Sequence, residues 1–285
     1  MPKVKSKLKS SLLRLQQEKQ LRDKHAAAIA NAEAKLKSIN KPKVKKIKNV
    51  EERQKQFPPV PYKQGERILL VGEGNFSFAR SLCDHIFREC SYAITATTND
   101  TEAVAYEKYT DARTHVSVIR EYGGVVIFEV DATQLDKCKP LKQHTFDKIV
   151  FNFPHVGLGI KHQSRNILAN QTLIQQFLQS SLAFLSSSSS EIHITLKTGA
   201  PYDDWQVKKI AKALDYVTKE TIRFYPEMYP VYEHRRTIGF KDNVSVGGNK
   251  ELEDKRCNTI IFWREKGGHI RDEGDHKGGN NSDGE

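Results

Sequence analysis

Several short apolar segments of this chain end in polar residues of the kinds that bind ligands. The first of them, Ile68–Val71, runs directly into GEGNFS at residues 72–77. Its two glycines allow a tight turn and a close approach of the backbone to a ligand, and the helix expected next offers free backbone N–H groups. A dinucleotide-binding fingerprint needs a third glycine where Ser77 stands, so this motif taken alone is a weak signal.

Carboxylates follow the next two apolar segments. Asp100 comes after Ala93–Thr98, where it could accept hydrogen bonds from ribose hydroxyls. Asp131 comes after Val125–Val130, where it could accept one from an adenine amino group. Either aspartate could instead cap a helix or close a turn. Three ligand-competent segment ends in a row favour a nucleoside ligand.

A fourth apolar segment, Phe146–Phe151, ends in Asn152-Phe153-Pro154-His155. An amide, an aromatic ring and a proline of fixed φ form a rigid cradle for a planar ring, since the aromatic can stack on a base and the amide can donate or accept. His155 could be a base, an orienting group or a packed loop histidine. The arrangement resembles the motif of methyltransferases that act on a planar nitrogen.

The segments that carry these residues alternate between strand and helix patterns. Continuous β-branched runs indicate strands buried on both faces, and their alternation with helices predicts an α/β fold with a doubly wound, mostly parallel sheet. Ligands bind such a sheet outside the carboxyl ends of its strands. The expected strands are Ile68–Val71, Ala93–Thr98, Val125–Val130, Phe146–Phe151, Glu191–Leu196, Thr221–Phe224 and Thr259–Trp263, and the expected helices are Phe76–Phe87, Thr101–Tyr109, Arg165–Phe184 and Tyr202–Leu214.

Charge separates an N-terminal arm from the rest of the chain. Residues 1–56 hold 17 of the 46 Lys and Arg but only 5 of the 35 Asp and Glu, so of the total charge of +11 the arm carries +12 and the remainder −1. Such an arm suits contact with a phosphate backbone or a nuclear address, and a solvated tail is the alternative. We expect a basic, partly helical arm at 1–56, one α/β domain at 57–264 and a disordered tail at 265–285.

Composition excludes several other classes. No apolar run approaches the ~18 to 20 residues that a membrane-spanning helix needs. The basic N-terminus lacks the apolar stretch of a secretory signal. The four cysteines are dispersed without a CxxC pair, which argues against a disulfide framework or a zinc ribbon. An intracellular protein without a metal site or membrane contact is expected.

Six segments between about Ile68 and Trp263 carry a resemblance to a known family: ILLVGEGNFSFARSL, TATTND, FEVDATQL, FDKIVFNFPHVGLGIKHQSRNILANQTLIQQF, LKTGAPYDDWQVKKIAK and YPVYEHRRT. They are similar to the eukaryotic Rossmann-like methyltransferases that modify a uridine of large-subunit (25S-type) rRNA at N3, using S-adenosyl-L-methionine. The resemblance implies that methyl donor and an rRNA target. Some relatives carry insertions before the fifth strand, where this chain has only a pentaserine loop.

The resemblance also implies roles for individual residues. Cofactor contacts would come from the turn after the first strand, from the aspartates after the second and third, and from the residues beside them. The floor under the methyl-accepting ring would come from the residues after the fourth strand. The cofactor set is Gly72, Glu73, Gly74, Asn75, Phe76, Asp100, Asp131, Ala132 and Asn152, and the catalytic set is Asn152, Phe153, Pro154, His155 and Lys197.

Uridine N3 carries a proton and is a poor nucleophile until that proton is lost, so the site must stabilise the uridinate or supply a base. Candidates are His155, Lys161, Lys197 and Asp203. Lys197 would act as a cation beside the developing charge, and an exposed lysine that ends a strand is the alternative. A pyrimidine C5 mechanism needs a nucleophilic cysteine, and no cysteine directly follows a proposed catalytic strand.

Two segments combine cations with flexible or aromatic residues. Residues 157–166 (GLGIKHQSRN) could close over a flipped-out nucleotide, and residues 229–236 (YPVYEHRR) could stack on bases and contact phosphates. A packed loop with surface charges is the alternative for each. The expected RNA-binding residues are Lys161, Arg165, Asn166, His234, Arg235 and Arg236.

The sequence leaves competing functions open. Asn-Phe-Pro-His also suits an exocyclic amine of adenine or guanine, a donor-binding but inert assembly factor is possible, and a nicotinamide dehydrogenase shares the fold class. The leading hypothesis is a monomeric rRNA uridine-N3 methyltransferase acting on rRNA or a pre-ribosomal particle in the nucleolus.

Overall fold

The computed structural model of the chain describes residues 57–87, 93–237, 249, 252 and 256–264. The arm 1–56 and the tail 265–285 lie outside the described residues. The chain divides into two compact units, Met1–Pro58 and Pro59–Glu285, and the second holds every element named below.

A seven-stranded sheet forms the centre of the second unit. Its order is β3-β2-β1-β4-β5-β7-β6, with β1 to β5 parallel and β7 antiparallel to both neighbours. The predicted doubly wound, mostly parallel sheet is confirmed. The strand order reverses between β1 and β4, where open α/β sheets bind ligands. The strands are β1 (Ile68–Val71), β2 (Ile94–Thr97), β3 (Val125–Ile127), β4 (Lys148–Asn152), β5 (Glu191–Lys197), β6 (Val217–Phe224) and β7 (Cys257–Trp263).

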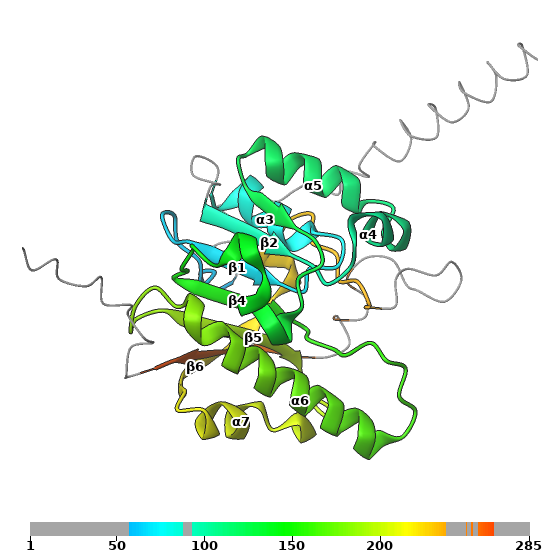
Figure 1. Cartoon of the computed structure of the whole chain (residues 1–285), viewed down its shortest axis with the longest axis vertical. Helices are drawn as coiled ribbons and strands as arrows, with labels where there is room; N and C mark the ends of the chain where they lie inside the picture. Colours follow the sequence, from blue (N-terminus) through cyan, green and yellow to red (C-terminus); the bar gives the residue numbers. More distant parts are fainter. Residues whose placement is uncertain (1–56, 88–92, 238–248, 250–251, 253–255, 265–285) are drawn as a thin grey trace, which may run out of the picture. The chain divides into compact units, whose positions relative to one another are not determined.

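Helices cover both faces of the sheet (Figure 1). The four side chains of β1 are all buried, and they pack alternately on the two faces. Ile68 and Leu70 pack into one apolar cluster, on the side of helices α3 and α5, whereas Leu69 and Val71 pack into the other, on the side of α6 and α7. Continuous apolar runs are therefore required on the central strands. The helices are α3 (Ser77–His85), α4 (Glu102–Lys108), α5 (Ala112–Glu121), α6 (Gln163–Ser181) and α7 (Val207–Ala213).

The helix predicted at 202–214 is interrupted. A 3₁₀ turn (η5, Asp203–Trp205) comes first, Gln206 then adopts φ 50°, and α7 begins at Val207. The Trp205 side chain is buried, and its burial stabilises the turn that separates the two helical pieces. Propensity alone favoured a single helix here, and tertiary packing overrides it.

Helix α5 was not predicted from the sequence. Its buried residues Ala112, His115, Val116 and Ile119 follow a helical period, but one of the four is polar. The apolar signal over this segment is consequently thin.

Replacing Phe177 with alanine tests the packing that holds α6 on the sheet. Phe177 is fully buried and meets Phe151 of β4 edge to face, with ring centroids 5.0 Å apart. We expect Phe177→Ala to lower the free energy of unfolding by about 3 to 5 kcal/mol, because it removes apolar burial and leaves a cavity. Leu168→Ala on the same helix, where the leucine is 63% exposed, should change it by under about 0.5 kcal/mol. Urea unfolding of both variants measures the difference, and equal losses would contradict this packing.

Candidate active site

A cavity of about 660 Å³ opens at the carboxyl ends of β1, β2 and β4. Residues far apart in the sequence line it because these strands are parallel and end at the same edge. Eight of the nine predicted cofactor residues are among them: Gly72, Glu73, Gly74, Asn75, Asp100, Asp131, Ala132 and Asn152.

The turn after β1 needs its glycines. Gly72 adopts φ +69°, and a Cβ there would overlap the ring of Phe151. A Cβ on Gly74 would lie 3.3 Å from the Cβ of Arg235, tighter than ordinary contact. At these two positions the turn presents backbone without a side chain.

Phe76, the ninth predicted cofactor residue, does not line the cavity. Its side chain is fully buried and meets Phe128 edge to face, with centroids 5.7 Å apart. Its φ of 63° turns the chain into α3. The structure thus places this phenylalanine in the core.

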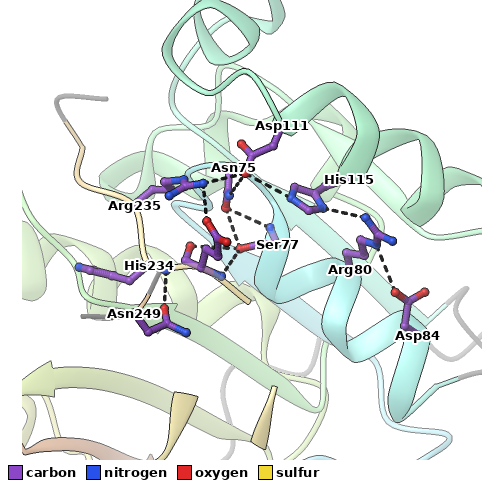
Figure 2. Close-up of polar contacts among 10 residues, drawn as sticks. Asn75, Ser77, Arg80, Asp84, Asp111, His115, His234, Arg235 and Asn249 are labelled. Atoms are coloured by element: carbon purple, nitrogen blue, oxygen red, sulfur yellow. Dashed lines mark hydrogen bonds and ion pairs between the residues drawn. The ribbon is translucent and has the colours of Figure 1, made fainter. Parts of the chain in front are cut away.

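Asn75 and Ser77 join the turn to a distant segment (Figure 2). Asn75 Oδ1 accepts hydrogen bonds from the backbone N–H and the hydroxyl of Ser77, at 3.2 and 2.7 Å. The Ser77 hydroxyl also accepts from the backbone N–H of Glu233, 3.0 Å away. Residues 233–235 therefore lie against the turn after β1, although they follow β6.

The two strand-end aspartates differ in their surroundings. Asp100 pairs with Lys108 of α4 at 2.6 Å. Asp131 caps the 3₁₀ helix Ala132–Lys137 by accepting from the Thr133 backbone N–H at 2.8 Å. The capping role left open by the sequence is therefore present at Asp131, which also lines the cavity.

Glu73 brings a carboxyl group into the cavity wall. It is 8% exposed, and burial raises its pKa to about 7, partly offset by a 3.3 Å hydrogen bond from the Ala79 backbone N–H. This carboxyl is therefore poised to change charge near neutral pH, a property common at functional sites.

A second cavity of about 360 Å³ shares six lining residues with the first. The shared wall includes Phe153, His155 and His234, and the second cavity adds Pro154, Lys197 and Arg236. The predicted catalytic residues are thus divided between the first cavity, the shared wall and the second cavity. Two adjoining cavities suit a reaction that transfers a group between two molecules.

Asn152 is the last residue of β4, and it lines the first cavity. Its amide nitrogen and oxygen are both buried and have no hydrogen-bond partner among the described residues. A buried amide without partners is costly, so a ligand that pairs with it gains affinity.

The residues after Asn152 form the shared wall. Phe153 adopts φ 52°, and its ring meets that of His234 at 4.6 Å between centroids. His155 Nδ1 accepts the Gly157 backbone N–H at 2.9 Å, and burial lowers the pKa of His155. The neutral ring therefore carries its proton on Nε2 and acts as a donor there.

Positive charge surrounds His234. Burial lowers the pKa of His234 to about 3, and three nearby cations contribute to the shift. These are Lys197, Arg236 and Arg235. The imidazole stays neutral at physiological pH, and the potential at this wall favours anions.

Arg235 is held by two carboxylates. Its Nη2 lies 2.9 Å from Asp111 Oδ2 and 2.6 Å from Glu233 Oε2, and the side chain is 13% exposed. Burial opposes ionisation of Asp111, but hydrogen bonds from His115, Arg235 and Asn75 outweigh it and hold the pKa of this carboxyl well below its usual range.

Sequence reasoning missed Asp111 and Asn170. Asn170 of α6 is fully buried; its Oδ1 accepts from the Val156 backbone N–H at 3.0 Å, and its Nδ2 donates to the Asn166 carbonyl at 2.9 Å. It therefore ties the loop after β4 to α6. Both residues were missed because a polar side chain on a helix gives no local sign of a distant partner.

Three predicted RNA-binding residues lie away from both cavities. Lys161 and Arg165 are exposed near the start of α6 and line neither cavity. Asn166 takes part in the Asn170 network. Their role in RNA binding stays a prediction.

Fold and site together define a Rossmann-like α/β domain with two adjoining cavities at the reversal of strand order. The model of the BMT5-like family, described as rRNA (uridine-N3-)-methyltransferase, matches residues 69–236. The chain belongs to this family.

Individual proteins that are similar to this chain include the following. An uncharacterized Arabidopsis thaliana protein, At4g26485, is 37% identical, with 70% of this chain and 94% of that protein covered. The Saccharomyces cerevisiae 25S rRNA (uridine(2634)-N(3))-methyltransferase is 28% identical, with 76% of this chain and 79% of that protein covered. Among solved structures, a ribosomal protein L11 methylase from Lactobacillus delbrueckii subsp. bulgaricus is 10% identical over 76% of this chain and 77% of its own, with a TM-score of 0.41.

Replacing Glu73 with glutamine tests the raised pKa. A carboxyl that titrates near 4.5 when unfolded and near 7 when folded keeps its proton in the folded state over that interval, so stability falls as pH rises through it. We expect the wild type to lose roughly 3 kcal/mol relative to Glu73→Gln between pH 4.5 and pH 8. Urea unfolding at several pH values gives the free energy of unfolding of both proteins. The difference between the two cancels the titration of groups that they share. A difference that stays constant with pH would contradict the raised pKa of Glu73.

Proposed function

We propose that this chain transfers the methyl group of S-adenosyl-L-methionine to N3 of a uridine in large-subunit rRNA, with the donor in the 660 Å³ cavity and the uracil in the 360 Å³ cavity. The proposal depends chiefly on the shared wall of Phe153, His155 and His234, where a donor on one side meets an acceptor on the other. Holding two reactants in contact supplies much of the rate in such transfers.

The residues of the first cavity fit this donor. Gly72 and Gly74 leave room for the methionine part beside the backbone, while Asp100 and Asp131 offer carboxylate oxygens to the ribose and adenine. When bound, the donor supplies a methyl group on a positively charged sulfur. The Glu73 carboxyl in the same wall would balance that positive charge in its ionised form.

The second cavity fits an acceptor that becomes an anion. Loss of the N3 proton leaves negative charge shared with the two uracil carbonyls, and preorganised positive charge stabilises that form. The cations that help to lower the pKa of His234 would lower that of uridine N3 for the same electrostatic reason. Lys197, Arg235 and Arg236 all line this cavity and bring positive charge to its wall.

The protonated Nε2 of His155 and the unpartnered Asn152 amide provide the directional contacts. Nε2–H can donate to a uracil carbonyl, and the amide can donate to one carbonyl or accept from the ring. His155 is therefore proposed as an orienting donor rather than as the base for the N3 proton.

The cations around His234 favour uridine over an exocyclic amine, because an amine acceptor develops positive charge during transfer. Nucleoside mass spectrometry after incubation with S-adenosyl-L-methionine and unmodified large-subunit rRNA separates the two. 3-Methyluridine is the expected product. Formation of N-methylated adenosine or guanosine would show that the acceptor is an exocyclic amine instead. No product despite donor binding would favour an inert assembly factor.

The setting of the reaction is part of the proposal. The yeast relative acts on 25S rRNA by name, and the arm at 1–56 has the charge to remain on a polyanion. We place the chain as a monomer on rRNA or a pre-ribosomal particle in the nucleolus.

Asn152→Ala tests the amide in the wall of the 660 Å³ cavity, one residue before the shared wall begins. We expect kcat to fall by about 10²- to 10³-fold, because the variant loses a preorganised contact to the acceptor. The amide of Gln176, exposed on α6 outside both cavities, provides the matched control, and Gln176→Ala should retain wild-type kcat. Steady-state formation of 3-methyluridine at saturating donor and RNA measures kcat for both variants, and full activity of Asn152→Ala would refute the role.

Lys197→Met tests the electrostatic lowering of the N3 pKa. Losing this charge raises the pKa of bound uridine, so the rate at pH 7 should fall by roughly tenfold and the rising limb of the pH–rate profile should move about one unit upward. Lys212→Met, on the exposed side of α7, serves as the charge-matched control. A uniform loss at every pH, with no displacement of the profile, would contradict the electrostatic role.

A further inference from the structure

One carboxylate oxygen joins the donor side of the site to the acceptor side. Asp111 Oδ2 lies 2.9 Å from Asn75 Nδ2, in the turn after β1, and 2.9 Å from Arg235 Nη2, in the segment after β6 (Figure 2). These partners are 36 and 124 residues away from Asp111 in the chain.

The side chain of Asp111 joins a network of polar contacts rather than capping the helix that follows it. It precedes α5, yet its side chain makes no capping hydrogen bond to that helix. His115, one turn later, approaches the same oxygen at 3.5 Å and contacts Arg80, which pairs with Asp84 at 3.1 Å. Asp84 thus lies at the far end of the same network, outside both cavities.

Both partners of Asp111 line a cavity. Asn75 lines the donor cavity, and Arg235 lines both cavities next to His234 in the shared wall. The Cβ of Arg235 also lies close to Gly74. A ligand that fixes the turn after β1 therefore fixes, through Asp111, a side chain that shapes the acceptor cavity.

We propose that Asp111 is a positioning residue that couples the two cavities, so that occupancy of the donor cavity strengthens binding of RNA in the acceptor cavity. Ordering Asn75, Asp111 and Arg235 costs side-chain entropy. The first ligand bears that cost and the second binds a wall already ordered, which gives positive cooperativity. The coupling rests on the proposed function, because it assigns donor and RNA to these two cavities.

The coupling is measured as the change in RNA affinity on saturation with S-adenosylhomocysteine. For the wild-type chain and an unmethylated large-subunit rRNA transcript we expect at least about a fivefold tightening, the lower end of typical couplings. In Asp111→Asn the tightening should fall below about twofold. Asp84→Asn, the same chemical change at the far end of the network, should keep the wild-type ratio.

If Asp111 had a merely structural role, Asp111→Asn would weaken donor binding and RNA binding separately. The tightening of RNA binding by S-adenosylhomocysteine would then stay at its wild-type value. That result in a folded Asp111→Asn, or a wild type whose RNA affinity ignores S-adenosylhomocysteine, overturns the coupling. In a double-mutant cycle, Arg235→Gln should abolish the same tightening of RNA binding by S-adenosylhomocysteine. Combining it with Asp111→Asn should cause no further loss of that tightening. Additive losses in the double variant would also overturn the coupling. Failure of the proposed function is distinct, because the wild type would then not bind S-adenosylhomocysteine or would form no 3-methyluridine.

Discussion

The return of residues 233–235 to the turn after β1 is the contact on which the rest of the site depends. A serine hydroxyl, a half-buried carboxylate and a guanidinium fasten the two segments together. Without that return the first cavity would lack one side and the second would lose its boundary with the first. The parallel strands bring the cofactor residues to one edge, but a segment from the antiparallel part of the sheet divides the space into two.

A second buried charge cluster shows why perturbed ionisation alone does not identify a site. At the start of β4 and β5, Lys148 lies 3.4 Å from Glu191 and 3.1 Å from Glu66, and His193 lies 2.8 Å from Glu191. The pKa of Glu191 falls to about 2 there, since hydrogen bonds and cations outweigh burial. These charged groups form ion pairs with one another, and they line none of the described cavities. Asn152 differs because it borders open volume, and neither polar atom of its amide has a hydrogen-bond partner among the described residues.

The hydrophobic periodicity and the residues at the strand ends were enough to predict the strands and most residues of the first cavity. All seven strands were located, and eight of nine proposed cofactor residues face one cavity, because the carboxyl ends of parallel strands must converge. Phe76 was misplaced because a residue within a ligand-binding turn can still point into the core. Asp111 and Asn170 could not be found, since their partners come together only through the tertiary fold. The pairing of Arg235 with two carboxylates was equally invisible, so its cation looked available for RNA.

The close approach of Gly74 to Arg235 has a consequence for how this site can change over evolution. A Cβ at position 74 would lie 3.3 Å from the Cβ of Arg235, so this side chain would have to shift by a few tenths of an ångström. That shift acts on the same residue whose guanidinium pairs with Asp111. The two positions are therefore expected to be inherited as a pair, and homologues with a side chain at position 74 should also carry a remodelled segment at 233–235.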